Sequence, residues 1–247
     1  MLSVPIDPAK FKNPLVTAKG GIRAHVALRS LETLWFNTGT LCNLTCHNCY
    51  IESSPRNDRL VYLAAAEVAH YLDEIERNGH DTKLIGFTGG EPFMNRELPA
   101  MLDDVLSRGL KAMVLTNAMK PMHKMKPALL RLLERHGQNL TLRVSIDHYG
   151  RALHEGERGA RSWKPTIDGL VWLAQAGFDV HVAGRRFSDE TEDQVRDGYA
   201  RLFAELGVPI DARARLRWCC FPRWTRRSTC PRSPRRAGAS SARHPTA

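Results

Sequence analysis

A repeating unit of apolar run, loop, amphipathic segment and glycine constrains the fold of residues 33–211 more than any other feature of the sequence. The apolar runs have the length of strands, whereas the longer segments place apolar residues three and four positions apart, as one face of a helix does. A glycine follows each amphipathic segment, and glycine readily adopts the left-handed backbone conformation with which many helices end. The predicted strands span residues 33–37, 83–88, 111–116, 140–146 and 178–183, and the predicted helices span residues 63–78, 95–108, 127–136, 165–176 and 190–206.

Strands that alternate with helices indicate an α/β protein with a parallel sheet, because right-handed crossovers place helices over its faces. A chain of 247 residues is long enough for one such domain. Five strands, with a sixth expected near residue 216, predict a partial (β/α)6 TIM-like barrel that lacks its last strand. A doubly wound open sheet is the alternative. In both architectures ligands bind at the carboxyl ends of the strands.

The segment 212–247 has a composition unlike that of the preceding chain. It holds ten of the 36 Lys and Arg residues and no acidic residue, which leaves 26 basic and 26 acidic residues in the neutral segment 1–211. A disordered basic arm that binds RNA is one interpretation. We favour translation in a shifted reading frame, because the codons from Trp218 to Phe221, read from the third base, encode Val-Leu followed by Leu or Phe. Nucleic acid is therefore not an expected partner.

These differences divide the chain into an N-terminal extension at residues 1–32, a core domain at residues 33–211 and an out-of-frame, disordered tail at residues 212–247. Loss of the sixth strand would leave an unpaired apolar edge and impair the chain. No apolar run approaches the roughly 18 residues that span a bilayer, and the N-terminus lacks the features of a secretory signal. We therefore expect a cytoplasmic protein with no membrane partner, in which cysteines serve as ligands or thiols.

Three cysteines, Cys42, Cys46 and Cys49, follow the first predicted strand with the spacing CxxxCxxC. Thiolates bind iron–sulfur clusters, and this motif supplies one ligand fewer than the usual four. The iron without a protein ligand would be open to a reactant, as catalytic zinc sites keep one open position. A structural zinc site that includes His47 is the alternative, although residues 33–211 hold no second Cys/His pair.

The run Gly89-Gly90-Glu91-Pro92 follows the second predicted strand. Glycines allow a main chain to approach a ligand closely, with torsion angles that other residues avoid. The Glu91 carboxylate can accept a hydrogen bond from an ammonium group, and Pro92 fixes the turn as the chain leaves the strand. An ordinary Gly-Pro turn with a surface glutamate is the alternative.

The CxxxCxxC motif after the first strand and the GGEP run after the second together resemble the radical SAM enzymes, which use S-adenosylmethionine (SAM) and an iron–sulfur cluster. The resemblance covers residues 33–211. It implies a [4Fe-4S] cluster on Cys42, Cys46 and Cys49, SAM on the open iron, and an electron donor such as ferredoxin or flavodoxin. Reductive cleavage of SAM would give methionine and a 5′-deoxyadenosyl radical that abstracts hydrogen from the substrate.

The same resemblance assigns roles to residues at the strand ends. Gly89, Gly90 and Glu91 correspond to the turn that binds the amino group of SAM, and Asn117 and Ser145 correspond to polar positions at its carboxylate or ribose. A turn or capping role is the alternative for the last two. The stretch 143–147 resembles that of radical SAM peptide maturases and of molybdenum cofactor biosynthesis protein A.

Three further strand-end residues, Asp147, His148 and Arg185, are candidates for contacts with the substrate. Arg185 would bind a carboxylate or phosphate, and a solvated loop or surface position is the alternative for all three. Asn48 stands where many radical SAM relatives have an aromatic residue, so a usual adenine contact is absent or supplied elsewhere. No pattern identifies a catalytic side chain or separates peptide, nucleoside, sugar and lipid substrates. Non-catalytic iron–sulfur or zinc binding, and nucleic-acid binding through the arginine-rich tail, are the alternative functions.

Overall fold

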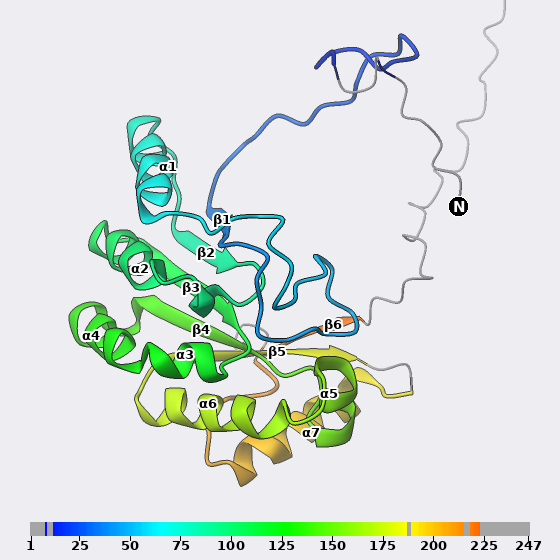
Figure 1. The fold of residues 1–247 in the computed structure, drawn as a ribbon, viewed down its shortest axis with the longest axis vertical. Coiled ribbons are helices and arrows are strands. Elements are labelled where there is room, and N and C mark those ends of the chain that lie inside the picture. Colours follow the sequence, from blue (N-terminus) through cyan, green and yellow to red (C-terminus); the bar gives the residue numbers. More distant parts are fainter. Residues whose placement is uncertain (1–7, 9–11, 187–188, 215–217, 223–247) are drawn as a thin grey trace, which may run out of the picture.

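The computed structural model describes residues 8, 12–186, 189–214 and 218–222. Its six strands form one parallel sheet in the order β1-β2-β3-β4-β5-β6 (Figure 1). The strands are β1 Thr33–Asn37, β2 Leu84–Thr88, β3 Lys111–Thr116, β4 Leu140–Ser145, β5 Asp179–Arg186 and β6 Trp218–Pro222. The helices are α1 Ala65–Arg77, α2 Leu98–Ser107, α3 Lys120–Lys124, α4 Lys126–His136, α5 Arg151–Arg158, α6 Trp163–Gln175 and α7 Glu192–Glu205, with 3-10 helices η1 Pro92–Met94 and η2 Gly137–Asn139.

Burial alternates along β4 and β5 because one face of the sheet packs against the helices, whereas β2 and β3 each have three consecutive buried residues. In β4 the side chains of Leu140, Leu142 and Val144 are fully buried, whereas those of Arg143 and Ser145 are half-buried. The buried set joins apolar residues of α1, α2, α4, α6 and α7 in one hydrophobic core, and these helices lie along one side of the curved sheet (Figure 1). β1 and β6 stand at opposite ends of the strand order. The sheet is therefore an open arc, which confirms the predicted α/β partial TIM-like barrel.

The predicted absence of a last strand is wrong for the main chain. β6 pairs with β5 in parallel register, with Val182 opposite Trp218 and Arg186 opposite Pro222. A ladder of main-chain hydrogen bonds needs only an extended backbone, and proline is tolerated on an edge strand. β5 is therefore not the open edge that the sequence predicted. The shifted-frame hypothesis stays a prediction, because most of residues 212–247 lie outside the described residues.

The ends of the predicted helices agree with the observed ends to within three residues. The largest difference is at α2, which begins at Leu98 and not at residue 95. Asn95 lies before the helix, and its amide donates to the carbonyl of Leu63 at 2.7 Å, which ties the segment after η1 to the residues before α1. The glycines predicted to end helices do have φ between 58° and 87°: Gly79, Gly109, Gly137, Gly177 and Gly207.

The segments that flank the core differ in how they pack. From residue 12 onward, the described part of the N-terminal extension lies away from the sheet (Figure 1), and Ile22 and Val26 within it are 89% and 96% exposed. After α7 the core contacts continue past the predicted boundary at residue 211. Ala212 is buried, and its carbonyl accepts a hydrogen bond from Arg196 Nη1 at 2.8 Å.

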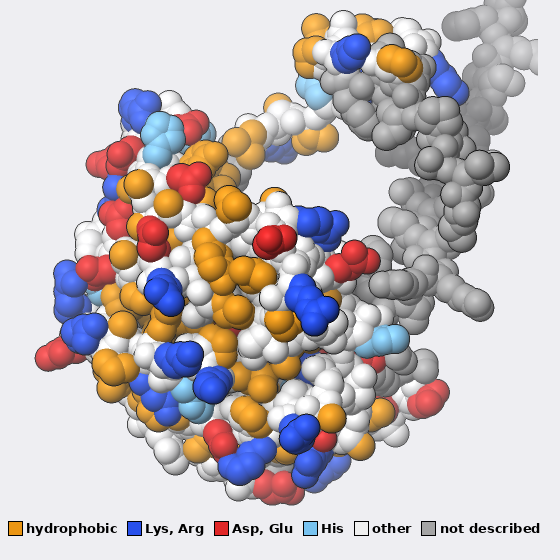
Figure 2. Space-filling view, viewed as in Figure 1, with side chains coloured by type: hydrophobic (Ala, Val, Ile, Leu, Met, Phe, Trp, Pro, Cys, Tyr) orange, Lys and Arg blue, Asp and Glu red, His pale blue; other side chains and the backbone are white. Residues whose placement is uncertain are grey.

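Charged side chains of both signs are interspersed on the face shown in Figure 2, in keeping with the equal numbers of acidic and basic residues in segment 1–211. Some of these charges join helices. Arg108 at the end of α2 lies 2.6 Å from Asp73 of α1 and 2.9 Å from Asp104 of its own helix. None of the described helices is both long and apolar enough to cross a bilayer.

Candidate functional site

The cysteine loop, residues 42–49, follows β1 and carries three free thiols. Cys42 is buried, and Cys46 and Cys49 are half-buried. Sγ of Cys42 accepts a hydrogen bond from the main-chain N–H of Leu44 at 3.4 Å, and Sγ of Cys49 accepts one from Ser53 at 3.3 Å. N–H donors of this kind stabilise thiolate ligands and tune a bound cluster. The donor set therefore fits an iron–sulfur cluster.

Burial makes the thiols of Cys42 and Cys46 hard to ionise without a cation. It raises the pKa of Cys42 to about 12 and also raises the pKa of Cys46, while the Arg158 charge opposes the rise at both. Among the described residues no group of three His, Cys, Asp or Glu side chains could hold a single metal ion. A [4Fe-4S] cluster does not need that convergence, because its cysteines bind different irons.

The Gly89-Gly90-Glu91 turn packs directly against the cysteine loop. Gly90 N–H donates to the Gly39 carbonyl at 2.9 Å, and Glu91 N–H donates to the Leu41 carbonyl at 3.0 Å. A Cβ on Gly90 would lie 2.1 Å from the Leu41 oxygen, and Gly89 has a φ of 135°. The close approach that glycine permits here is thus to the main chain that carries Cys42, which brings the two sequence motifs into contact.

Glu91 points inward rather than into a cavity. Its Oε1 accepts from Thr116 Oγ1 at 2.8 Å and from the N–H of Phe93 at 3.2 Å, and its Oε2 accepts from the N–H of Asn117 at 2.8 Å. Burial outweighs these hydrogen bonds and raises the Glu91 pKa to about 7. The carboxylate therefore joins the ends of β2 and β3, and Thr116 is a partner that sequence reasoning missed.

Asn117 and Ser145, predicted at the SAM carboxylate or ribose, have different surroundings. Asn117 is buried; its Nδ2 donates to Asn43 Oδ1 at 2.9 Å and its Oδ1 accepts from the N–H of Met119 at 3.0 Å. It thus connects β3 to the cysteine loop. Ser145 is half-buried, and its hydroxyl makes no hydrogen bond with any described residue. Of the two, Ser145 keeps its side chain available, and both assignments stay predictions.

Asp147 and Arg185, predicted to contact substrate, lie together with Arg158 of α5. Arg158 Nη2 donates to Asp147 Oδ1 at 3.2 Å, and Arg158 Nε lies 3.0 Å from Oδ2. Arg185 Nε donates to Oδ1 at 3.1 Å. Burial alone would raise the Asp147 pKa, but the two guanidinium groups hold it below its usual range. These three residues, called the charge triad below, join the ends of β4 and β5 to α5.

The charge triad also reaches the cysteine loop. Arg185 Nη1 donates to the carbonyl of Asn48 at 3.3 Å. The Asn48 side chain in turn donates to Glu157 Oε2 at 2.6 Å, and the Glu157 carbonyl accepts from the N–H of His47 at 2.8 Å. Sequence reasoning missed Glu157 and Arg158 because α5 carries no apolar stripe of the kind that identified the other helices.

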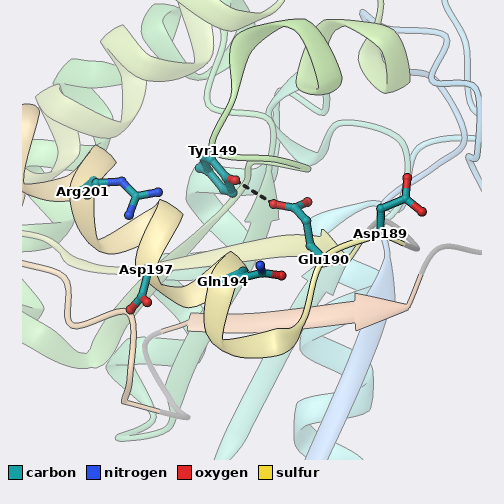
Figure 3. Close-up of a pocket in the computed structure, with 6 residues that line it drawn as sticks. All are labelled: Tyr149, Asp189, Glu190, Gln194, Asp197 and Arg201. Carbon is teal, nitrogen blue, oxygen red and sulfur yellow. Dashed lines mark hydrogen bonds between the residues drawn. The ribbon is translucent and has the colours of Figure 1, made fainter.

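His148, the remaining substrate candidate, is 3% exposed. Its Nε2 lies 2.8 Å from Glu190 Oε2, and Tyr149 donates to Glu190 Oε1 at 2.6 Å. Glu190 belongs to a hollow between the β4–α5 connection on one side and the β5–α7 connection with α7 on the other (Figure 3). The hollow is lined by Tyr149, Asp189, Glu190, Gln194, Asp197 and Arg201.

The sequence matches the Radical SAM superfamily over residues 36–197. The antilisterial bacteriocin subtilosin biosynthesis protein AlbA of Bacillus subtilis (strain 168) is 31% identical over 181 residues, which cover 70% of this chain and 39% of AlbA. Streptococcus suis SuiB bound to S-adenosylmethionine has a similar fold, with a TM-score of 0.60 and 17% identity over 77% of this chain and 40% of SuiB. TYW1 with a lysine-pyruvate adduct bound also has a similar fold, with a TM-score of 0.52 and 12% identity over 80% of this chain and 67% of TYW1. The chain thus spans about two fifths of AlbA and of SuiB.

Proposed function

This chain belongs to the radical SAM superfamily, and we propose that it is an enzyme that abstracts a hydrogen atom from a peptide. In this proposal Cys42, Cys46 and Cys49 hold a [4Fe-4S] cluster beside bound SAM, and a ferredoxin or flavodoxin supplies the electron. The observation that best supports this proposal is the 3.0 Å hydrogen bond from Glu91 N–H to the Leu41 carbonyl. It joins the glycine turn to the residue next to Cys42, so both motifs form one site.

The residues of this chain would bind and orient SAM. The carbonyls of Gly89 and Gly90 accept no hydrogen bond within the described part of the chain, so they suit an ammonium group. The free hydroxyl of Ser145 suits a carboxylate or ribose oxygen. Glu91 keeps the turn in place through its contacts with Thr116 and Asn117. When bound, the cluster would supply the electron that breaks the sulfonium bond of SAM.

A peptide is the substrate class that the relatives favour. AlbA is a bacteriocin biosynthesis protein, and SuiB is also known bound to its precursor peptide SuiA. The identity to SuiB is low, so that likeness concerns the fold, and AlbA carries the argument for a peptide. Because the chain spans only part of both proteins, the substrate of the whole protein is part of the proposal.

Anaerobic reconstitution with iron and sulfide tests the cofactor assignment. The wild type should take up about four irons per chain and, once reduced by dithionite, release 5′-deoxyadenosine from SAM. Cys46→Ala should lose both properties, whereas Thr45→Ala in the same loop should keep them. Preferential uptake of zinc, or bound iron without 5′-deoxyadenosine, would instead support the non-catalytic alternative.

Deuterium transfer tests the substrate class. Precursor-like peptides encoded beside the gene, prepared with deuterated side chains, should pass deuterium into 5′-deoxyadenosine. Unlabelled product from every peptide, together with continued SAM cleavage, would remove the peptide assignment while leaving the radical SAM assignment intact.

A further inference from the structure

The charge triad is mostly shielded from solvent although every member is ionisable. The exposed fractions of the side chains are 4% for Asp147, 10% for Arg158 and 23% for Arg185. Burying charges costs several kcal/mol per ion, and a well-packed apolar cluster of similar volume is often at least as stable. Stability alone therefore does not explain why two guanidinium groups converge on one carboxylate at this place.

The triad carries a net positive charge beside the cysteines. Two guanidinium groups face one carboxylate, and the Arg158 charge acts to lower the pKa of the Cys42 and Cys46 thiols against the effect of burial. Nε of Arg158 and Oδ2 of Asp147 are buried without a hydrogen-bond partner. The pair is thus held by charge more than by aligned hydrogen bonds.

The triad is also mechanically connected to the loop that carries the cysteines. Arg185 holds the Asn48 carbonyl, which lies between Cys46 and Cys49. The last turn of α5 holds the same loop through Glu157, which contacts both His47 and Asn48. A change in the charge of the triad would therefore act on the loop that carries the sulfur ligands.

We propose that Arg158 is a positioning residue with an electrostatic role: it holds the cysteine loop through Asp147, and its charge raises the reduction potential of the cluster bound there. The inference rests on the proposed function, because it concerns a cluster on the three cysteines. A positive charge favours the state that has gained an electron, and the low dielectric of a buried site strengthens the effect. Asp147 opposes it, so the two members of one ion pair act with opposite sign.

Redox titration of reconstituted variants without SAM tests this sign. Arg158→Gln should lower the midpoint potential of the cluster, and Asp147→Asn should raise it, although both substitutions break the same ion pair. Arg158→Lys keeps the charge and should restore most of the wild-type potential. Arg151→Gln, an exposed residue of the same helix, should leave the potential unchanged. Omitting SAM ensures that the shift reports on the cluster and not on cofactor binding.

The outcomes separate this inference from the proposed function. Failure of the wild type to bind a cluster would end the proposed function. A wild-type cluster with shifts of the same sign in Arg158→Gln and Asp147→Asn, or with no shift in either, would overturn the electrostatic role. If Arg158→Gln does not retain iron, Arg185→Gln removes a more exposed charge of the same triad, and its potential should also fall. An unchanged or raised potential in that variant would count against the inference.

Discussion

Two groups of strand-end residues hold the cysteine loop, and they do so by different physics. At β2 and β3 a single buried acid, Glu91, accepts hydrogen bonds from three donors. At β4 and β5 the charge triad combines two basic groups with one acid. The first group is fixed beside the loop mainly by main-chain hydrogen bonds to Gly39 and Leu41, with one side-chain bond from Asn117 to Asn43. The second holds the loop mainly through the side chains of Arg185 and Asn48, with one main-chain bond from His47 to Glu157.

This difference determines which of the two groups can be altered by substituting side chains. A main-chain contact such as that between Glu91 and Leu41 survives most changes of side chain. The contacts of Arg158 and Arg185 do not, so the β4–β5 end is where sequence change can adjust the loop and its charge. The following predictions test that contrast on the cluster-free protein, so that they do not depend on cofactor loading.

The largest effect is expected from breaking the charge triad. Arg158→Met should destabilise the fold by roughly 3–5 kcal/mol, because it leaves a buried carboxylate with one partner fewer. Arg151→Met breaks the exposed pair with Glu155 on the same helix and should cost about 0.5 kcal/mol or less. Urea denaturation measures both. Equal losses of unfolding free energy in the two variants would show that burial does not make the triad more important for stability than an exposed ion pair.

Glu91 should make stability depend on pH. Its pKa in the folded state, about 7, lies above the ordinary value of 4.5. The stabilising contribution of Glu91 to the free energy of unfolding is therefore complete below pH 4.5 and is lost as the pH rises to 7. The loss should approach about 3 kcal/mol. Glu91→Gln does not titrate and should lack this slope. Parallel pH profiles of unfolding free energy for the two proteins would contradict the prediction.

His154 should give a slope of the opposite sign beside the triad. Burial, with help from Arg158, lowers its pKa from 6.5 to about 4. Its stabilising contribution is therefore present above pH 6.5 and is lost as the pH falls to about 4, by at most about 3 kcal/mol. His154→Phe keeps a ring against Trp163, 5.3 Å away in the wild type. That variant should remain stable where the wild type weakens on acidification.

The smallest effect concerns a link between α6 and the end of β3. Thr166 Oγ1 donates to the Asn117 carbonyl at 3.1 Å, and both residues are buried. Thr166→Val keeps the shape and removes the donor, which should cost about 1–2 kcal/mol. Thr166→Ser keeps the hydroxyl and loses only the methyl group, so it is the matched control. A Thr166→Val protein as stable as the wild type would show that the carbonyl finds another partner.

The elements with apolar periodicity were predictable from sequence, and the charged ones were not. β1 is found at residues 33–37 as predicted, and the cysteine and glycine motifs meet at the strand ends where ligands gather. α5 was not predicted because its residues, Arg151–Arg158, show no apolar stripe. The bond between Asn48 and Glu157 joins residues 109 positions apart, and no local pattern encodes such a separation. The sixth strand was expected only in a shifted reading frame, but β6 pairs with β5 in the given sequence, because strand pairing depends on the main chain alone.

That independence has a consequence for substitutions at the rim of the arc. β6 is joined to β5 by amide and carbonyl groups, and every residue except proline supplies both. Exchanges within β6 that keep the backbone extended should therefore leave this pairing intact.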